Sequence, residues 1–77
     1  MSRLERMKTV FRMLYPAQQQ AVRIHMDENF NPSDPRCDSD ETVQPYFCDL
    51  MLAAIEAEIP RRWVDRMKRE FDLETNP

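Results

Sequence analysis

The chain has 77 residues, 42% of them apolar and 32% charged, with a formal net charge of −3 and no glycine. This length allows one small domain, residues 1–77, and so short a chain buries only about 60% of its unfolded surface, which leaves little apolar area to enclose an active site. Phosphate-binding loops and tight primed hairpin turns are excluded because they depend on glycine. The composition therefore predicts an all-α fold, a small bundle of about four helices, that is not an enzyme.

The charges are unevenly distributed along the chain. Residues 1–26 carry five cations against one acid, residues 27–60 carry one cation against nine acids, and residues 61–77 carry five cations against four acids. The net negative charge argues against indiscriminate nucleic-acid binding, which depends on cations that neutralise phosphates. We expect the basic first helix to fold near the acidic middle of the chain. The alternative is that the chain offers its basic and acidic regions as opposite faces to a partner.

Two helices are predicted in the first third of the chain, at 3–15 and 16–28. Ser2 and Glu5 have the spacing of a capping box. Pro16 ends the first helix and begins the second, because proline has no amide and disfavours the α conformation in the preceding residue. Apolar residues recur at helical intervals in the first helix, namely Leu4, Met7, Val10, Phe11 and Leu14.

Residues 29–41 are rich in acids, prolines and other turn formers and have almost no apolar content. They predict a long, exposed acidic loop between helices two and three, mobile unless it is the partner site. Asp40 or Thr42 can cap the third helix, expected at 43–58, in which Pro45 is tolerated in the first turn.

The third helix is expected to be central, because apolar residues extend almost around it. A fourth helix is expected at 60–73, with Trp63, Val64, Met67 and Phe71 on its apolar face. The predicted shared core consists of Phe11, Leu14, Phe47, Leu50, Met51, Val64 and Met67.

The sequence contains few residues suited to catalysis or metal binding. His25, the only histidine, has no spacing to Cys37 or Cys48 that matches a tight zinc ligand pair. The acids of residues 34–41 lack the glycine of a calcium-binding EF-hand loop, and a nucleophilic cysteine would need an identifiable base. We expect no metal, no cofactor and two free thiols, with a single disulfide as the alternative in an oxidising compartment.

The first residues lack the apolar stretch of a secretion signal, and no apolar run approaches the ~20 residues that span a bilayer. We therefore expect a cytoplasmic protein with no membrane partner.

Residues 50–69 resemble the helix-turn-helix of DNA-binding regulators. Ala54 occupies the small position of the first helix, Ile59 the apolar position of the turn, and Val64 and Met67 the two apolar positions of the second helix.

The resemblance implies that residues 60–73 form a recognition helix that enters a DNA groove. The sequence departs from the pattern at Glu58, where the family has glycine, because a side chain there must adopt the strained left-handed conformation or the turn must differ. The residues that would face DNA are Arg61, Arg62, Asp65, Arg66 and Arg69.

The leading hypothesis is a non-catalytic protein-binding module that acts as a small inhibitor, adaptor or regulator of a partner protein. Arginine and aromatic residues commonly anchor interfaces, and six methionines supply adaptable apolar surface. The short, helical, glycine-free chain is similar in general character to accessory proteins of bacteriophages and other mobile elements, and its small core favours a homodimer. The candidate partner-binding residues are Arg61, Arg62, Arg66 and Arg69 on helix four and Tyr15, Phe30 and Tyr46, which together with Met13 lie off the apolar stripes and are expected to be exposed.

Overall fold

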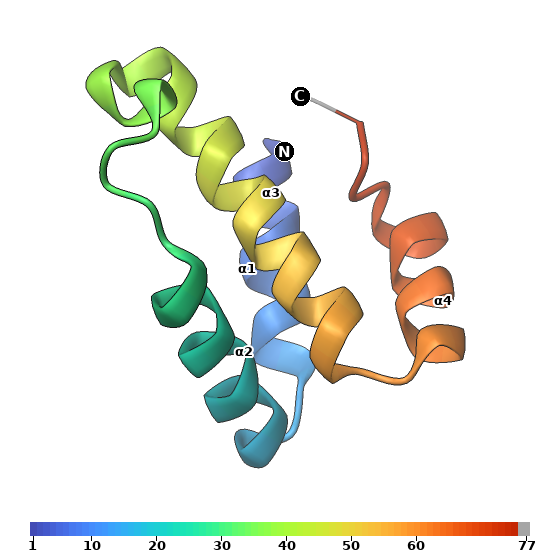
Figure 1. The fold of residues 1–77 in the computed structure, drawn as a ribbon. Helices are drawn as coiled ribbons and strands as arrows, with labels where there is room; N and C mark the ends of the chain where they lie inside the picture. The colour runs from blue at the N-terminus through green and yellow to red at the C-terminus, as the bar shows by residue number, and fades with distance from the viewer. Residues whose placement is uncertain (76–77) are drawn as a thin grey trace.

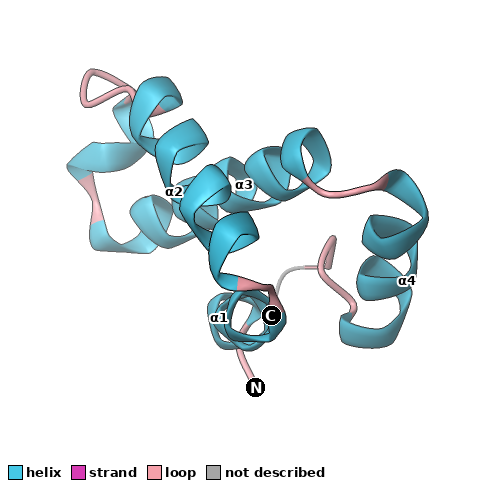
Figure 2. Ribbon diagram, turned by 90° about the horizontal axis from the view of Figure 1, so that it is seen from below, coloured by secondary structure: helices cyan, strands magenta, loops and turns pink. Residues whose placement is uncertain are grey.

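A computed structural model describes residues 1–75, which are helical with no strand among them (Figure 1). The elements in chain order are α1 (Arg3–Met13), α2 (Pro16–Asn29), a short 3-10 helix η1 (Pro35–Asp38), α3 (Asp40–Glu58) and α4 (Arg61–Phe71). The predicted all-α fold with four helices is confirmed. Helices α2 and α4 lie on opposite sides of the pair formed by α1 and α3 (Figures 1 and 2). Over residues 1–75, none of the helices has the length and apolar character needed to cross a membrane.

Local signals set the ends of the first two helices. Ser2 Oγ accepts a hydrogen bond from the Glu5 amide at 3.2 Å, as the capping pattern predicts. Pro16 is the first residue of α2, and the Tyr15 amide donates to Gln18 Oε1 at 3.1 Å. The predicted boundary at Pro16 is therefore confirmed, although α1 itself ends at Met13.

The segment between α2 and α3 is not the long acidic loop predicted from its composition. Helix α2 continues to Asn29, and α3 begins at Asp40 behind a Ser39 cap, so that Pro45 lies inside the helix rather than in its first turn. Asp34 Oδ1 accepts from the Arg36 amide at 2.9 Å and starts η1. The composition misled the prediction because the prolines and small polar residues that form turns also begin helices.

This connecting segment is also tied to α3. Arg36 donates to Asp49 Oδ2 at 3.1 Å and lies over the ring of Tyr46, 4.7 Å from its centroid. The Tyr46 hydroxyl accepts from the Asn31 amide at 2.8 Å. The hydrogen bond from Arg36 also lowers the pKa of Asp34, so the charged pair favours the η1 conformation.

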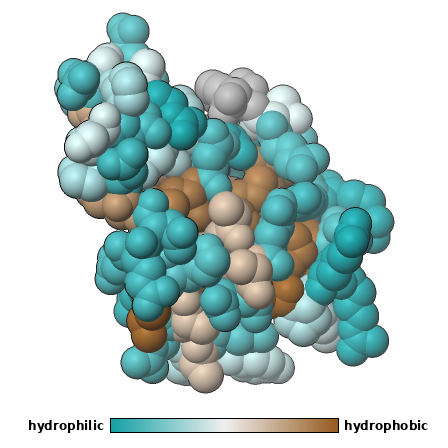
Figure 3. Space-filling view, in the orientation of Figure 1, coloured by the Kyte–Doolittle hydropathy of each residue, from teal (hydrophilic) through white to brown (hydrophobic). Residues whose placement is uncertain are grey.

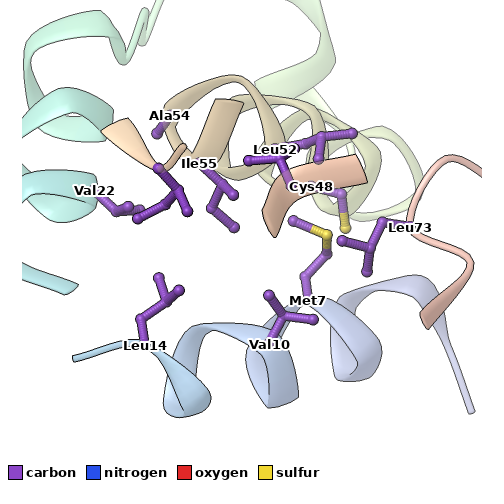
Figure 4. Close-up of a cluster of buried hydrophobic side chains, with 11 residues drawn as sticks. Met7, Val10, Leu14, Val22, Cys48, Leu52, Ala54, Ile55 and Leu73 are labelled. Atoms are coloured by element: carbon purple, nitrogen blue, oxygen red, sulfur yellow. The ribbon is translucent and has the colours of Figure 1, made fainter. Parts of the chain in front are cut away.

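The core is formed mainly by one stripe of α3 packed on α1 and α2 (Figure 4). The stripe of α3 recurs at helical intervals through Cys48, Leu52 and Ile55 and continues at Ile59. The other buried apolar residues around it are Met7, Val10, Leu14, Val22, Ala54, Val64 and Leu73.

The predicted core is correct in part. Leu14 and Val64 are buried, and Phe11, Met51 and Met67 pack partly against the core. Leu50 is only half-buried and Phe47 is 38% exposed. The prediction was wrong for these two because α3 is apolar around most of its circumference, so its sequence alone does not indicate which side is buried.

Arg3 connects the two ends of the chain to the centre of the fold. Its Nε donates to the Leu73 carbonyl at 2.6 Å and its Nη1 donates to Asp49 Oδ1 at 2.9 Å. Leu73 reaches the core because Asp72 takes the left-handed conformation, with φ of 51°, and reverses the chain after α4. The ion pair places basic α1 against acidic α3, as the charge distribution predicts.

Candidate partner-binding groove

A groove separates α4 from the junction of α1 and α2, and three large, partly exposed apolar side chains line it. Met13 is 62% exposed, Tyr15 76% and Trp63 47%. The groove has a volume of about 410 Å³, with Leu14 and Ile59 at its buried side. We call it the Trp63 groove. Its remaining lining residues are Gln18, Arg66, Met67, Glu70 and Phe71.

Backbone geometry at the α1–α2 junction explains how one side of the groove is built. Leu14 and Tyr15 are both extended, each with ψ of 152°. Successive side chains of an extended segment point in opposite directions. Leu14 is therefore buried while Tyr15 projects to the surface beside Met13.

The other side of the groove is one face of α4. Trp63, Met67 and Glu70 follow one another at intervals of four and three residues, with Arg66 and Phe71 beside them. These positions span about two helical turns, or ~12 Å along the axis. The groove therefore presents a helical wall with apolar groups at its centre.

Charged groups border this wall. Arg66 Nε lies 2.9 Å from Glu70 Oε1, and the hydrogen bond raises the pKa of Arg66. The Arg62 guanidinium lies 5.7 Å from the ring centroid of Trp63. This geometry is a cation–π contact at the surface. It sets the Trp63 ring beside a positive charge.

The structure brings together only some of the predicted partner-binding residues. Tyr15 and Arg66 both line the groove, whereas Arg61, Arg62 and Arg69 lie exposed on α4 outside its lining. The side chain of Arg61 is 94% exposed and has Asp65 Oδ2 at 4.0 Å.

Phe30 and Tyr46 lie elsewhere, in an aromatic cluster with Phe47. Phe30 stacks on Phe47 with a centroid distance of 5.8 Å, and 39% of Phe30 is exposed. Tyr46 is buried, so its assignment to an exposed patch was wrong. Its hydroxyl is bonded to the Asn31 amide and its ring is covered by Arg36, which gives it a structural role.

Sequence reasoning missed Trp63 as a surface residue and placed it on the inward face of helix four. Val64, the next residue, is buried in its place, and Trp63 is displaced to the edge of that face. The apolar stripe of α4 includes the adjacent residues 63 and 64, so it is too wide for all of its residues to be buried. This width is the sequence signal that could have identified Trp63 as a surface residue.

The connection between α3 and α4 differs from the turn of the helix-turn-helix pattern. Glu58 is the last residue of α3, and Ile59 and Pro60 are extended, with ψ of 142° and 136°. Among residues 1–75, only Asp72 has a positive φ. Glu58 therefore does not take the left-handed conformation of the glycine that it replaces.

Two other hollows have a volume of about 340 Å³ each, and only the first, between α3 and α4, is bordered largely by polar groups. One includes Lys68, whose Nζ lies 2.7 Å from Glu56 Oε1 and 3.0 Å from Glu74 Oε1. Both carboxylates raise the pKa of Lys68. The polar groups of this hollow thus satisfy one another.

The residues considered for metal binding lie apart. His25 Nδ1 is 3.3 Å from Glu58 Oε1, while Cys37 is half-buried near the Asn31 carbonyl and Cys48 is buried in the core. Both thiols are free. Within the part of the chain that is described, no cluster of three or more histidine, cysteine or acidic side chains could hold a metal ion.

The remaining surface is largely hydrophilic on the face shown in Figure 3. Apolar side chains form a band through its middle, where α3 crosses the molecule in Figure 1, and hydrophilic residues cover both sides.

The chain matches no protein-family model, no curated protein and no solved structure.

Proposed function

We propose that this chain is a non-catalytic protein-binding module, a small inhibitor, adaptor or regulator, and that the Trp63 groove is its binding surface. The observation that carries the proposal is the joint exposure of Met13, Tyr15 and Trp63 around one groove. Burial of apolar surface is favourable by roughly 25 cal/mol per Å², so side chains gathered in this way gain stability when a partner covers them.

The residue types of the groove also suit an interface. Tryptophan, tyrosine and arginine supply most binding hot spots, and a polar rim around an apolar centre is the usual anatomy of an interface. Trp63 and Tyr15 form the apolar centre here, with Arg62 and Arg66 at the border.

DNA binding by α4 is the second candidate, and its support is the exposure of Arg61, Arg62 and Arg69 on one helix. The extended turn at Ile59 and Pro60 weighs against it, since the recognition-helix geometry implied by the resemblance depends on a different turn. The apolar side chains of the groove would also remain in water if phosphates were the only contacts.

Site-specific photo-crosslinking tests the proposal. A benzophenone amino acid replaces Tyr15 in one variant and Ile24 in a matched control, since Ile24 is 49% exposed on α2 and lies outside the groove. In cells that naturally make the protein, position 15 should form a crosslink to a defined protein that position 24 does not form. Adding Trp63→Ala should lower its yield about tenfold or more. Identical products from both positions would contradict the proposal.

A DNA shift assay at two salt concentrations separates the second candidate. We expect no sequence-specific shift by the wild-type protein at physiological salt. A specific shift that Arg62→Ala abolishes, with a smaller salt dependence, would instead support DNA recognition by α4.

A further inference from the structure

We infer that the Trp63 groove receives an amphipathic helix of the partner protein, with acidic residues flanking its apolar face. The inference rests on the proposed function and adds to it the conformation and charge of the bound segment.

The shape of the groove favours a helix as its occupant. Its α4 wall offers apolar contacts over about two turns, which matches anchors at positions i, i+3 or i+4 and i+7 of an incoming helix. A peptide that binds by strand addition needs an exposed sheet edge, and residues 1–75 contain no strand. A helix, by contrast, arrives with its backbone hydrogen bonds already satisfied.

Three helices border the groove, and two of them, α1 and α4, are basic, while α2, which contributes Gln18, carries one cation against two acids. Helix α1 carries four cations against one acid, and α4 carries five cations against two acids. The elements η1 and α3 together carry one cation against six acids. The groove therefore lies between the basic elements of a chain that is acidic overall.

Several of these cations are already neutralised within the fold. Arg3 pairs with Asp49, Arg66 with Glu70, and Lys68 with Glu56 and Glu74. Arg6 of α1 donates to the carbonyls of Met1 and Thr75 and forms no ion pair within residues 1–75. The other cations of α1 and α4 that form no ion pair in this part of the chain are Lys8, Arg12, Arg62 and Arg69.

Three of these unpaired cations border the groove. Arg62 and Arg69 share a stripe with Arg66, at intervals of four and three residues, along one edge of the α4 wall. Arg12 precedes Met13 on the other side of the groove and donates to Thr9 Oγ1 at 3.5 Å. Lys8 lies one helical turn before Arg12 on α1 and is therefore further from Met13 and the groove. Both rims thus offer positive charge, which complements acids on either side of an apolar helix face.

Trp63 makes this inference directly measurable, because it is the only tryptophan in the chain and it lines the groove. The probes are three synthetic helix-forming peptides without tryptophan. They share the same leucine and phenylalanine anchors and differ only in whether glutamate, glutamine or lysine flanks them. Trp63 emission and peptide anisotropy are followed at low and high salt, and circular dichroism reports helix formation.

We expect the glutamate peptide to shift Trp63 emission to the blue and to bind about tenfold more tightly than the glutamine peptide, with the lysine peptide weakest. The difference should shrink at high salt because exposed charges are screened. Arg62→Glu should reduce the preference for glutamate, whereas Lys8→Glu, which changes the net charge equally away from the groove, should largely retain it.

The outcomes separate this inference from the proposed function. If all three peptides bind equally, or the lysine peptide binds best, the acidic flank is wrong. If none alters Trp63 emission while position 15 still crosslinks to a protein, the helical occupant is wrong and the protein-binding function stands. A shift in emission with protein concentration alone would mean that a second copy of the chain fills the groove, which would also overturn the inference.

Discussion

Arg3 is the residue on which both ends of the chain converge. Its guanidinium bonds the Leu73 carbonyl and the Asp49 carboxylate while its side chain is 7% exposed. The charge distribution predicted that basic α1 would meet the acidic middle of the chain. The bond to Leu73 could not be predicted, because it depends on the chain reversal at Asp72.

Arg3→Ala should destabilise the fold by about 1–3 kcal/mol, because a buried carbonyl loses its hydrogen bond while Asp49, which is half exposed, can be solvated again. Urea unfolding measures the change. Arg3→Lys should recover part of the lost stability, because lysine restores the positive charge but lacks the planar guanidinium that bonds both acceptors. Wild-type stability in Arg3→Ala would show that the Leu73 contact contributes nothing.

Burial raises the pKa of the Cys48 thiol. The unfolded chain therefore ionises this thiol at lower pH than the native fold does, and stability should decline as the pH rises past about 9. Cys48→Ala should remove this part of the pH dependence. In native protein, Ellman's reagent should modify half-buried Cys37 quickly and Cys48 only at the rate of opening. Equal rates would contradict the burial of Cys48.

At the scale of elements, helix α3 shows what the spacing of apolar residues can predict and what it cannot. Its existence and central position could be predicted from its apolar content, but its buried face could not, because too many of its positions are apolar. The structure buries Ile55 completely and leaves Leu50 half-buried. Met7 and Val10, by contrast, lie on the apolar stripe predicted for the first helix, and both are fully buried, although the predicted core did not include them.

Ile55→Ala should therefore cost about 2–5 kcal/mol through lost burial and an internal cavity. Leu50→Ala should cost less than half as much. Chemical unfolding of the two variants side by side checks the order. A larger loss in Leu50→Ala would show that α3 packs by a different face.

The structure of the segment between α2 and α3 could not be predicted from its composition, for a different reason. Asp34, Ser39 and the prolines have the same preferences in loops and at helix starts. What decides between these outcomes is tertiary contact, here from Arg36 to Asp49 and Tyr46. The same contacts turn Tyr46 from a predicted surface residue into a buried one.

At the scale of the whole molecule, the groove exists only because residues 13–18 and residues 59–71 meet in space. Sequence patterns could predict that Tyr15 and the arginines of α4 are exposed, since they lie off the apolar stripes. They could not predict that Tyr15 and Trp63 share one groove. The position of α4 beside α1, with Leu73 returning to the core, produces that arrangement.

The central claim is that a protein partner covers the Trp63 groove, and quantitative affinity purification with two variants tests it most directly. Trp63→Ala removes a groove residue, and Ile24→Ala removes an apolar residue of similar exposure outside the groove. We predict that a protein recovered with the wild type falls about tenfold or more with Trp63→Ala and is retained with Ile24→Ala, while both variants keep the wild-type helix content. Equal recovery with the two variants, or loss with Ile24→Ala alone, would contradict the claim.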